Sequence, residues 1–378
     1  MRHISITALT AFALFAACNS RPVNQFELTG EIDGADGQTI YIMYQHGDSM
    51  VTDSTVITDG TFDFIGNIDK PTAGALYLGK ELMGSRTATR VYLEPAAMTV
   101  TGLTADDFSE AELTGSATHA DMTEYNRTVN PISEQLSALR DSLGKASSEN
   151  EREAIQANMD ALREAYSNAS LDFIRNHPAS YYSASLLRMA SSSLTYEELK
   201  AMFEGLSPEV QAEAEEVARE IKALEAVQPG RPAPELTGIT PDGKEIKLSN
   251  LKGKVVLIDF WATWCGPCRA ALPHVRKLYD KYHDKGFEVF CVGDNDSNPD
   301  EWKKVIVEEG MEDYHNILRG LRTIEKNGKV VDFDRSNDQS EKYAVHYLPT
   351  KYLIATDGTV IGKIDKDEEL DRILEELL

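Results

Sequence analysis

Cysteine is scarce in this sequence, which contains only four cysteines in 378 residues. They are Cys18, Cys265, Cys268 and Cys291. So few thiols exclude a disulfide framework, because folds held together by disulfides carry several pairs in a much shorter chain. Two of the four cysteines stand close together, and we interpret this pair as a redox centre. Cys291 lies in an apolar run, which favours a buried, inert thiol over a redox partner.

Basic residues are also in the minority, with 38 lysines and arginines against 62 aspartates and glutamates, a net charge of −24. A surface of this sign repels phosphate backbones, which argues against a nucleic-acid partner. The acidic residues form no long tail, and we interpret them as a solvated surface. Beyond the N-terminus, the sequence has no apolar run of the ~20 residues that a membrane-spanning helix needs.

The N-terminus is predicted to be a targeting signal. A short basic start is followed by an apolar run at residues 4–17, which fits a signal peptide. The run ends in Leu14-Phe15-Ala16-Ala17-Cys18, which resembles a bacterial lipoprotein box although a phenylalanine stands where an aliphatic residue is usual. We therefore expect residues 1–18 to be a lipoprotein signal with Cys18 as the lipidated residue, which places the protein in the periplasm or cell envelope on a lipid anchor. Ordinary cleavage that leaves Cys18 a plain thiol is the alternative.

The rest of the chain divides into three predicted regions. The first alternates short strand-like runs with Asp-Gly turns, which is typical of a small antiparallel β-domain. The second has apolar residues at helical spacing, interpreted as intramolecular core rather than as a surface for a second copy of the chain. A proline-rich segment then marks a boundary. We predict a β-domain at 24–115, a helical region at 116–228 and a third domain at 229–378.

The chemistry of the third domain is concentrated in one motif. A continuous apolar run, Lys254-Val255-Val256-Leu257-Ile258-Asp259-Phe260-Trp261, predicts a buried strand, and Trp264-Cys265-Gly266-Pro267-Cys268 follows it, ahead of a helical pattern. A cysteine that opens a helix has its sulfur beside unpaired backbone N–H groups, which lower the thiol pKa below the free value of ~8.5. Two intervening residues let Cys268 reach Cys265. This spacing predicts a dithiol–disulfide centre.

Asp259 is the one charged residue inside the strand-like run 255–261. A carboxylate there is costly unless it has a partner or a task. Desolvation would raise its pKa, so the side chain could accept the Cys268 proton near neutral pH, through a water molecule. We interpret Asp259 as a catalytic base. A structural aspartate satisfied by backbone donors is the alternative.

Residues 255–268, VVLIDFWATWCGPC, together with Tyr347-Leu348-Pro349-Thr350, resemble thioredoxin. More narrowly, they are similar to the exported TlpA/ResA-like thiol–disulfide oxidoreductases of the redoxin superfamily. The resemblance covers about residues 228–378 and includes an inserted helix capped near Asn298. It implies an α/β thioredoxin-like C-terminal domain, a mixed sheet flanked by helices, preceded by the small antiparallel β-domain and the α-helical region.

The resemblance also implies roles for individual residues. Cys265 is the attacking thiol and Cys268 the resolving thiol. Pro349 is a cis-proline beside the disulfide, Leu348 supplies backbone hydrogen bonds to the substrate chain, and Trp264 flanks the docking surface. Asp259, treated above, matches the buried aspartate of thioredoxin. No cofactor other than the redox-active disulfide and no metal is implied.

Two positions depart from the family pattern. Ala271 stands where many exported relatives carry a glutamate, three residues after the second cysteine. The strand-like segment Phe290-Cys291-Val292-Gly293 lacks the lysine that faces the buried aspartate in thioredoxin. Both departures concern the proton relay rather than the thiol chemistry.

These features together predict an extracytoplasmic thiol–disulfide oxidoreductase that reduces disulfides in exported proteins. The resemblance implies a membrane thiol-transfer protein as electron donor and cytochrome c maturation as a candidate task. The Gly-Pro pair between the cysteines is that of thioredoxin, a reductant at about −270 mV, whereas DsbA-type oxidants lie near about −120 mV. A disulfide oxidase or isomerase is the alternative within this class. A partner-binding lipoprotein adaptor is the alternative from another class.

Metal binding is a further alternative that the sequence supports less well. One CxxC motif supplies two of the four ligands that a closed zinc site needs. His274 and His283 lie on the following helical segment, and we interpret them as exposed helix residues rather than as ligands.

Overall fold

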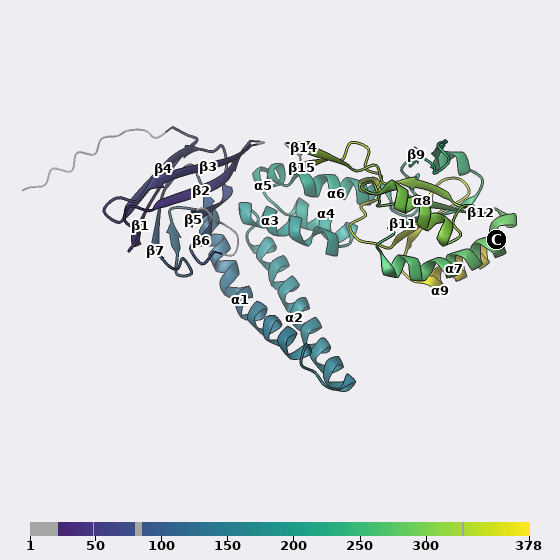
Figure 1. Ribbon diagram of the computed structural model, residues 1–378, viewed down its shortest axis with the longest axis horizontal. Helices are drawn as coiled ribbons and strands as arrows, with labels where there is room; N and C mark the ends of the chain where they lie inside the picture. Colours follow the sequence, from purple (N-terminus) through teal and green to yellow (C-terminus); the bar gives the residue numbers. More distant parts are fainter. Residues whose placement is uncertain (1–21, 48, 80–84, 327–328) are drawn as a thin grey trace, which may run out of the picture. The chain divides into compact units, whose positions relative to one another are not determined.

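The structure is a computed structural model of the chain, and it describes residues 22–47, 49–79, 85–326 and 329–378 (Figure 1). The predicted signal segment 1–18 and the lipidation site Cys18 lie outside these residues. Within them, no helix is both long enough and apolar enough to cross a membrane. The chain divides into two compact units: one runs up to Ser170 and includes Ser180–Tyr182, and the other comprises Leu171–Ala179 and Ser183–Leu378.

The first unit contains a β-sandwich. One sheet has the order β4-β1-β7-β8 and the other β3-β2-β5-β6. The strands are β1 (Gln25–Asp33), β2 (Thr39–His46), β3 (Ser49–Val56), β4 (Thr61–Asn67), β5 (Thr72–Leu78), β6 (Ala88–Leu93), β7 (Ala97–Thr104) and β8 (Glu112–Thr114). Their buried side chains alternate along the strands and form one shared core, in which Phe62 and Phe64 of one sheet join Ile40 and Ile42 of the other.

The pairing within the sandwich is antiparallel with one exception among the described strands. β1 runs antiparallel to β4 but parallel to β7. The antiparallel β-domain expected from the sequence is therefore confirmed in its main features. The parallel pair joins strands that are distant in the chain, so no local turn signal could have predicted it.

Helices follow the sandwich. They are α1 (Ala117–Leu143), α2 (Glu149–Asn176), α3 (Tyr181–Ala190), α4 (Tyr196–Glu204), α5 (Pro208–Glu213) and α6 (Glu215–Ala226), with a short 3-10 turn η1 (Ser191–Ser193). Two helix starts are those that the sequence predicts. Thr195 and Glu198 form a capping box at α4, and Ser207 caps α5 ahead of Pro208. The second unit includes α4, α5 and α6, while the predicted limits at 115 and 228 remain predictions of domain boundaries.

The C-terminal domain is built on a mixed sheet with the order β13-β12-β11-β16-β17. β11 runs parallel to β12 and antiparallel to β16. The strands of this sheet are β11 (Val255–Trp261), β12 (Phe287–Gly293), β13 (His315–Leu318), β16 (Thr350–Ile354) and β17 (Val360–Ile364). The other elements are β9 (Thr237–Ile239), β10 (Glu245–Lys247), η2 (Leu248–Leu251), α7 (Gly266–Tyr282), η3 (His283–Lys285), α8 (Pro299–Glu308), β14 (Arg322–Lys326), β15 (Lys329–Asp334), η4 (Glu341–Tyr343) and α9 (Asp367–Leu377).

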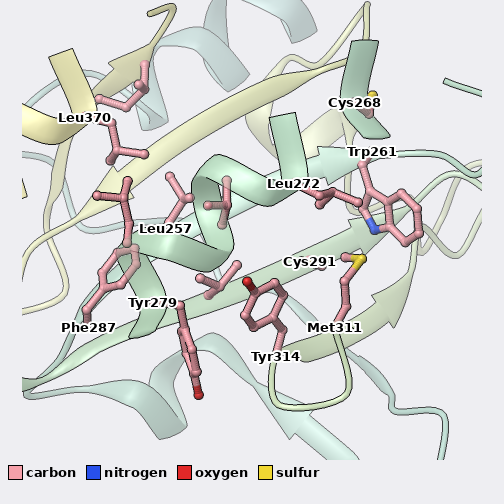
Figure 2. Close-up of a cluster of buried hydrophobic side chains, with 14 of the residues drawn as sticks. Leu257, Trp261, Cys268, Leu272, Tyr279, Phe287, Cys291, Met311, Tyr314 and Leu370 are labelled. Atoms are coloured by element: carbon pink, nitrogen blue, oxygen red, sulfur yellow. The ribbon is translucent and has the colours of Figure 1, made fainter. Parts of the chain in front are cut away.

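Both faces of the central strands are buried, so the strand β11 reads as a continuous apolar run. On one face, Leu257 and Trp261 of β11 pack with Leu272 of α7 and Leu370 of α9 (Figure 2). On the other face, Val256, Ile258 and Phe260 pack in a second cluster, with Tyr343 among its members. This sheet, covered on both faces, is the thioredoxin-like α/β fold expected from the sequence.

A buried ion pair fixes the segment between β13 and the loop that contains Pro349. Arg319 Nη2 lies 2.6 Å from Asp338 Oδ2, and Arg319 Nε donates to Asp338 Oδ1 at 2.8 Å. The Asp338 side chain is fully buried. Arg319 Nη1 also lies 3.2 Å from Asp294 Oδ2. Removing one partner of such a pair leaves an uncompensated buried charge.

We predict that Arg319→Met destabilises the second unit by about 3–5 kcal/mol, because the fully buried Asp338 carboxylate loses the arginine that contacts both its oxygens and keeps only Arg335 at 3.9 Å. The matched double variant Arg319→Met with Asp338→Leu should recover most of this loss. Guanidinium unfolding followed by tryptophan fluorescence measures it, since Trp261, Trp264 and Trp302 are the three tryptophans of the chain and all lie in this unit. A loss equal in the single and the double variant would contradict the prediction.

Candidate active site

The two cysteines of the CxxC motif lie at the start of α7 and form a disulfide with a Cα–Cα distance of 5.3 Å. Cys265 is the N-cap residue, and the backbone N–H of Cys268 donates to its sulfur at 3.2 Å. Pro267 occupies the first turn, where the missing N–H costs no helical hydrogen bond. The helix N-terminus therefore places backbone dipoles against the Cys265 sulfur, which is the arrangement that stabilises a thiolate. The structure joins the two cysteines in one disulfide at a helix start, as the spacing predicts.

The loop before β16 lies against this pair. The Leu348–Pro349 peptide bond is cis, as the resemblance implies. Leu348 packs against the buried cluster that includes Cys265 and Cys268. The ladder between β11 and β16 ends at the pair Phe260 and Thr350, so the backbone of Leu348 lies outside that ladder.

Exposed aromatic side chains stand next to both parts of the site in the chain. Trp264, directly before Cys265, is 69% exposed. Tyr347, directly before Leu348, is also exposed, and Lys363 Nζ donates to its hydroxyl and lies over its ring at 4.5 Å. Tyrosine and tryptophan are enriched at protein interfaces, so both side chains suit the docking of another chain. Trp264 was among the site residues predicted from the sequence, whereas Tyr347 was not.

Asp259 lies in the middle of β11 and is 2% exposed. Its Oδ1 has no hydrogen-bond partner among the described residues. Burial raises the pKa of this carboxyl from its usual value to about 7; the charge of Lys351 opposes the rise and that of Asp367 adds to it. The direction is the one expected from the sequence, and it leaves Asp259 able to exchange a proton near neutral pH.

Lys351 was not among the site residues predicted from the sequence. The segment Phe290-Cys291-Val292-Gly293 brings no lysine to Asp259, as expected, but Lys351 on β16 is the cross-strand partner of Asp259. On the other side, Cys291 of β12 is its partner. The sequence signal that could have found Lys351 is the one that marks Asp259, a charged residue within a strand-like segment. Lys351 likewise stands in a short strand-like segment, directly before the apolar residues Tyr352, Leu353 and Ile354.

Cys291 is fully buried, as expected. Burial raises the pKa of its thiol well above the usual value, and the nearby Asp259 carboxylate raises it further. The thiol is therefore protonated at neutral pH, which agrees with an inert residue.

His274 lies 2.9 Å from Asp371, and the described residues contain no group of three or more histidine, cysteine, aspartate or glutamate side chains that could hold a metal ion.

Helix α6 reaches the loop that carries Pro349. Glu220 Oε1 lies 2.5 Å from His346 Nε2, and this hydrogen bond raises the pKa of His346. The helical segment before the proline-rich boundary therefore supports the active-site loop from outside the CxxC domain predicted at 229–378. No local pattern in the sequence indicated this contact, because the two residues are 126 positions apart.

Comparison with known proteins agrees with this geometry. Residues 228–378 match the redoxin family, and residues 26–122 match a domain of unknown function, DUF4369. The thiol-disulfide oxidoreductase ResA of Bacillus thuringiensis subsp. konkukian is 33% identical over 154 residues, which cover 41% of this chain and 79% of that protein. The chain belongs to the ResA-like redoxin family. It is a thioredoxin-like thiol–disulfide oxidoreductase, which acts on disulfide-containing substrates.

A second ResA gives the same result for this ResA-like domain. ResA of Bacillus subtilis is 33% identical over 137 residues, 36% of this chain and 67% of that protein. Among solved structures, the thioredoxin domain of a thiol-disulfide oxidoreductase from Bacteroides vulgatus is 29% identical and covers 40% of this chain and 99% of that domain, with a TM-score of 0.33.

Proposed function

We propose that this ResA-like protein is an extracytoplasmic disulfide reductase, held at a membrane through a lipid on Cys18, that reduces disulfides in exported proteins. The observation that carries the proposal is the setting of the Cys265 sulfur. It accepts an N–H from Cys268 at the start of α7, and the two intervening residues, glycine and proline, bring no charge to it. Strong stabilisation of the thiolate makes a dithiol oxidising, as in DsbA, so a sulfur with no charged residue between the two cysteines favours a reductant.

The reaction transfers two electrons from the dithiol to the substrate. The Cys265 thiolate attacks one sulfur of the substrate disulfide, and the other substrate sulfur leaves as a thiolate, which takes a proton from solvent. Cys268 then gives its proton to Asp259, and the Cys268 thiolate attacks Cys265 in the mixed disulfide. The second substrate sulfur leaves as a thiolate and is protonated in turn. The protein ends with the Cys265–Cys268 disulfide, the state in the structure.

Substrate docking follows from the exposed groups around the pair. The apolar face of Trp264 and the backbone of Leu348 lie on either side of the disulfide in the proposed complex. A substrate strand aligned on Leu348 presents its sulfur to Cys265. Reduction of the spent Cys265–Cys268 disulfide requires an external dithiol, for which we propose a membrane thiol-transfer protein.

The reduction potential of the Cys265–Cys268 couple tests the proposed direction. We expect a value at or below about −230 mV, at the glutaredoxin–thioredoxin end of the known range. Equilibration with dithiothreitol buffers, followed by tryptophan fluorescence, gives the potential, and Trp264→Phe assigns the signal to the residue beside Cys265. A potential near about −120 mV would contradict the reductase and identify an oxidant or isomerase.

A further inference from the structure

Glu220 of α6 is largely buried, unlike Glu215 and Glu216 at the start of the same helix. Its side chain is 14% exposed, whereas theirs are 82% and 64% exposed. Turning a carboxylate away from water costs free energy unless a partner compensates it. The partner is His346, whose Nε2 lies 2.5 Å from Glu220 Oε1. The thiol steps described above give this contact no task, so it calls for a specific explanation.

His346 stands two residues before Leu348, whose backbone aligns the substrate in the proposed complex. Between them, Tyr347 is held by the CxxC domain itself, because the Thr350 hydroxyl donates to its carbonyl oxygen at 2.8 Å. His346 instead reaches α6, a helix that packs beside η4. The imidazole ring therefore ties the segment directly ahead of Leu348 to the helical region of the chain.

The surroundings of His346 favour its protonated form. The hydrogen bond to Glu220 raises the pKa of His346 and burial opposes the rise, while the charge of Glu341 adds to it and that of Lys363 opposes it. The other charged residues that line the cavity beside the ring are Arg188 of α3, Glu216 and Arg219 of α6, Arg319 and Arg335. A protonated imidazole makes a charge-assisted hydrogen bond to a carboxylate, which is stronger than the bond from a neutral ring. The contact is therefore strongest at low pH and weakens as the ring loses its proton.

We propose that Glu220 is a positioning residue for substrate docking, which through His346 holds the Leu348 backbone in the conformation that binds the substrate chain. This inference rests on the proposed function, in which a substrate strand aligns on Leu348. It gives the helical region a part in the reaction, since Glu220 lies before the domain predicted at 229–378. Docking is then tightest while the imidazole is protonated, and it weakens as the pH rises and the ring loses its proton.

Glu220→Gln removes the charge and keeps the shape of the side chain, so docking should weaken while the thiol chemistry is unchanged. The reduced full chain is mixed with a synthetic cyclic disulfide peptide, and tryptophan fluorescence gives the oxidation rate at each peptide concentration. At pH 6 the half-saturating concentration should rise about fivefold, the difference between a charge-assisted and a neutral hydrogen bond. The limiting rate should stay at the wild-type value. At pH 8.5 the half-saturating concentrations of the two proteins should differ by less than about twofold, because the ring is then neutral in both.

Glu216→Gln is the matched control, because it makes the same change one turn earlier on α6 at an exposed position. It should leave the half-saturating concentration unchanged. His346→Gln should reproduce the effect of Glu220→Gln, and the double variant should bind no more weakly than either single variant, since both remove the same contact. An equal effect of Glu216→Gln, additive effects in the double variant, or a wild-type value for Glu220→Gln at pH 6 would overturn the inference.

The backbone amide of Leu348 reports the same contact without a substrate. In the oxidised protein its ¹⁵N shift should titrate with a midpoint above 6.5, the ordinary value for histidine, and Glu220→Gln should lower that midpoint towards 6.5. Asp259→Asn in both proteins removes the buried carboxyl from the titration. A midpoint that Glu220→Gln leaves unchanged would contradict the inference. If the midpoint moves but the wild-type protein does not reduce the peptide, the proposed function fails and the positioning of Leu348 by Glu220 stands.

Discussion

Replacing Cys265 with serine should lower the rate of disulfide reduction on the order of 10³-fold or more, because a hydroxyl at neutral pH lacks the nucleophilicity of a thiolate. The sulfur occupies the N-cap of α7, where the Cys268 N–H donates to it. Serine is a good N-cap residue, so the fold should persist while the nucleophile is lost. The measurement is the initial rate of reduction of a cyclic disulfide peptide by the reduced protein, with thermal unfolding to verify the fold.

Cys268→Ser is the matched control for this variant, since it removes the other sulfur of the same disulfide. It leaves the first attack possible and blocks the second. We therefore expect the Cys268→Ser protein to accumulate a covalent mixed disulfide with the peptide, detectable by mass, whereas Cys265→Ser forms none. A mixed disulfide on Cys268 in the Cys265→Ser variant would reverse the assignment of attacking and resolving thiols.

Asp259→Asn should slow resolution of the mixed disulfide and stabilise the protein at the same time. The rate near pH 7 should fall on the order of 10²-fold, the lower end of what a general base contributes. The change in the rate of this step with pH around 7 should also disappear. That change follows the ionisation of the Asp259 carboxyl, whose pKa is raised by burial to about 7. Rapid mixing over a range of pH measures both effects.

The stability effect follows from linkage. The pKa of Asp259 is higher in the folded protein than in the unfolded chain, so the folded state binds the proton more tightly. The resulting stabilisation is complete below pH 3.8 and is lost as the pH rises to about 7. Asparagine carries no charge to desolvate. Above pH 7 the variant should therefore exceed wild type by up to about 4 kcal/mol, the free energy of a shift from 3.8 to about 7.

Asp284→Asn, at an exposed position in η3, is the matched control for this change and should alter the free energy of unfolding by no more than about 0.5 kcal/mol. Guanidinium unfolding at pH 4 and pH 8, followed by tryptophan fluorescence, gives both values. Equal stability of wild type and Asp259→Asn at pH 8 would show that the ionised carboxylate is satisfied in the interior. An unchanged resolution rate in the variant would remove Asp259 from the proton transfer.

Much of the active site could be predicted because its determinants are local. The strand Val255–Trp261 is apolar at every position but one, and the cysteine pair follows at the spacing that opens a helix. The capping residues Thr195 and Ser207 begin helices where their side chains can accept backbone N–H groups. Such features depend on neighbours within a few residues, which any sequence displays directly.

The remaining features depend on which distant segments meet. The sequence shows that Asp259 and Lys351 are each charged residues in apolar runs, but only the antiparallel register of β11 and β16 makes them partners. The contact of Glu220 with His346 likewise appears only when α6 packs beside the active-site loop. The sequence by itself determined the strands, the helix starts and the redox pair, since these follow from burial and local hydrogen bonding. Tertiary structure decided which charges face Asp259, because strand order and register are set by packing across the whole sheet.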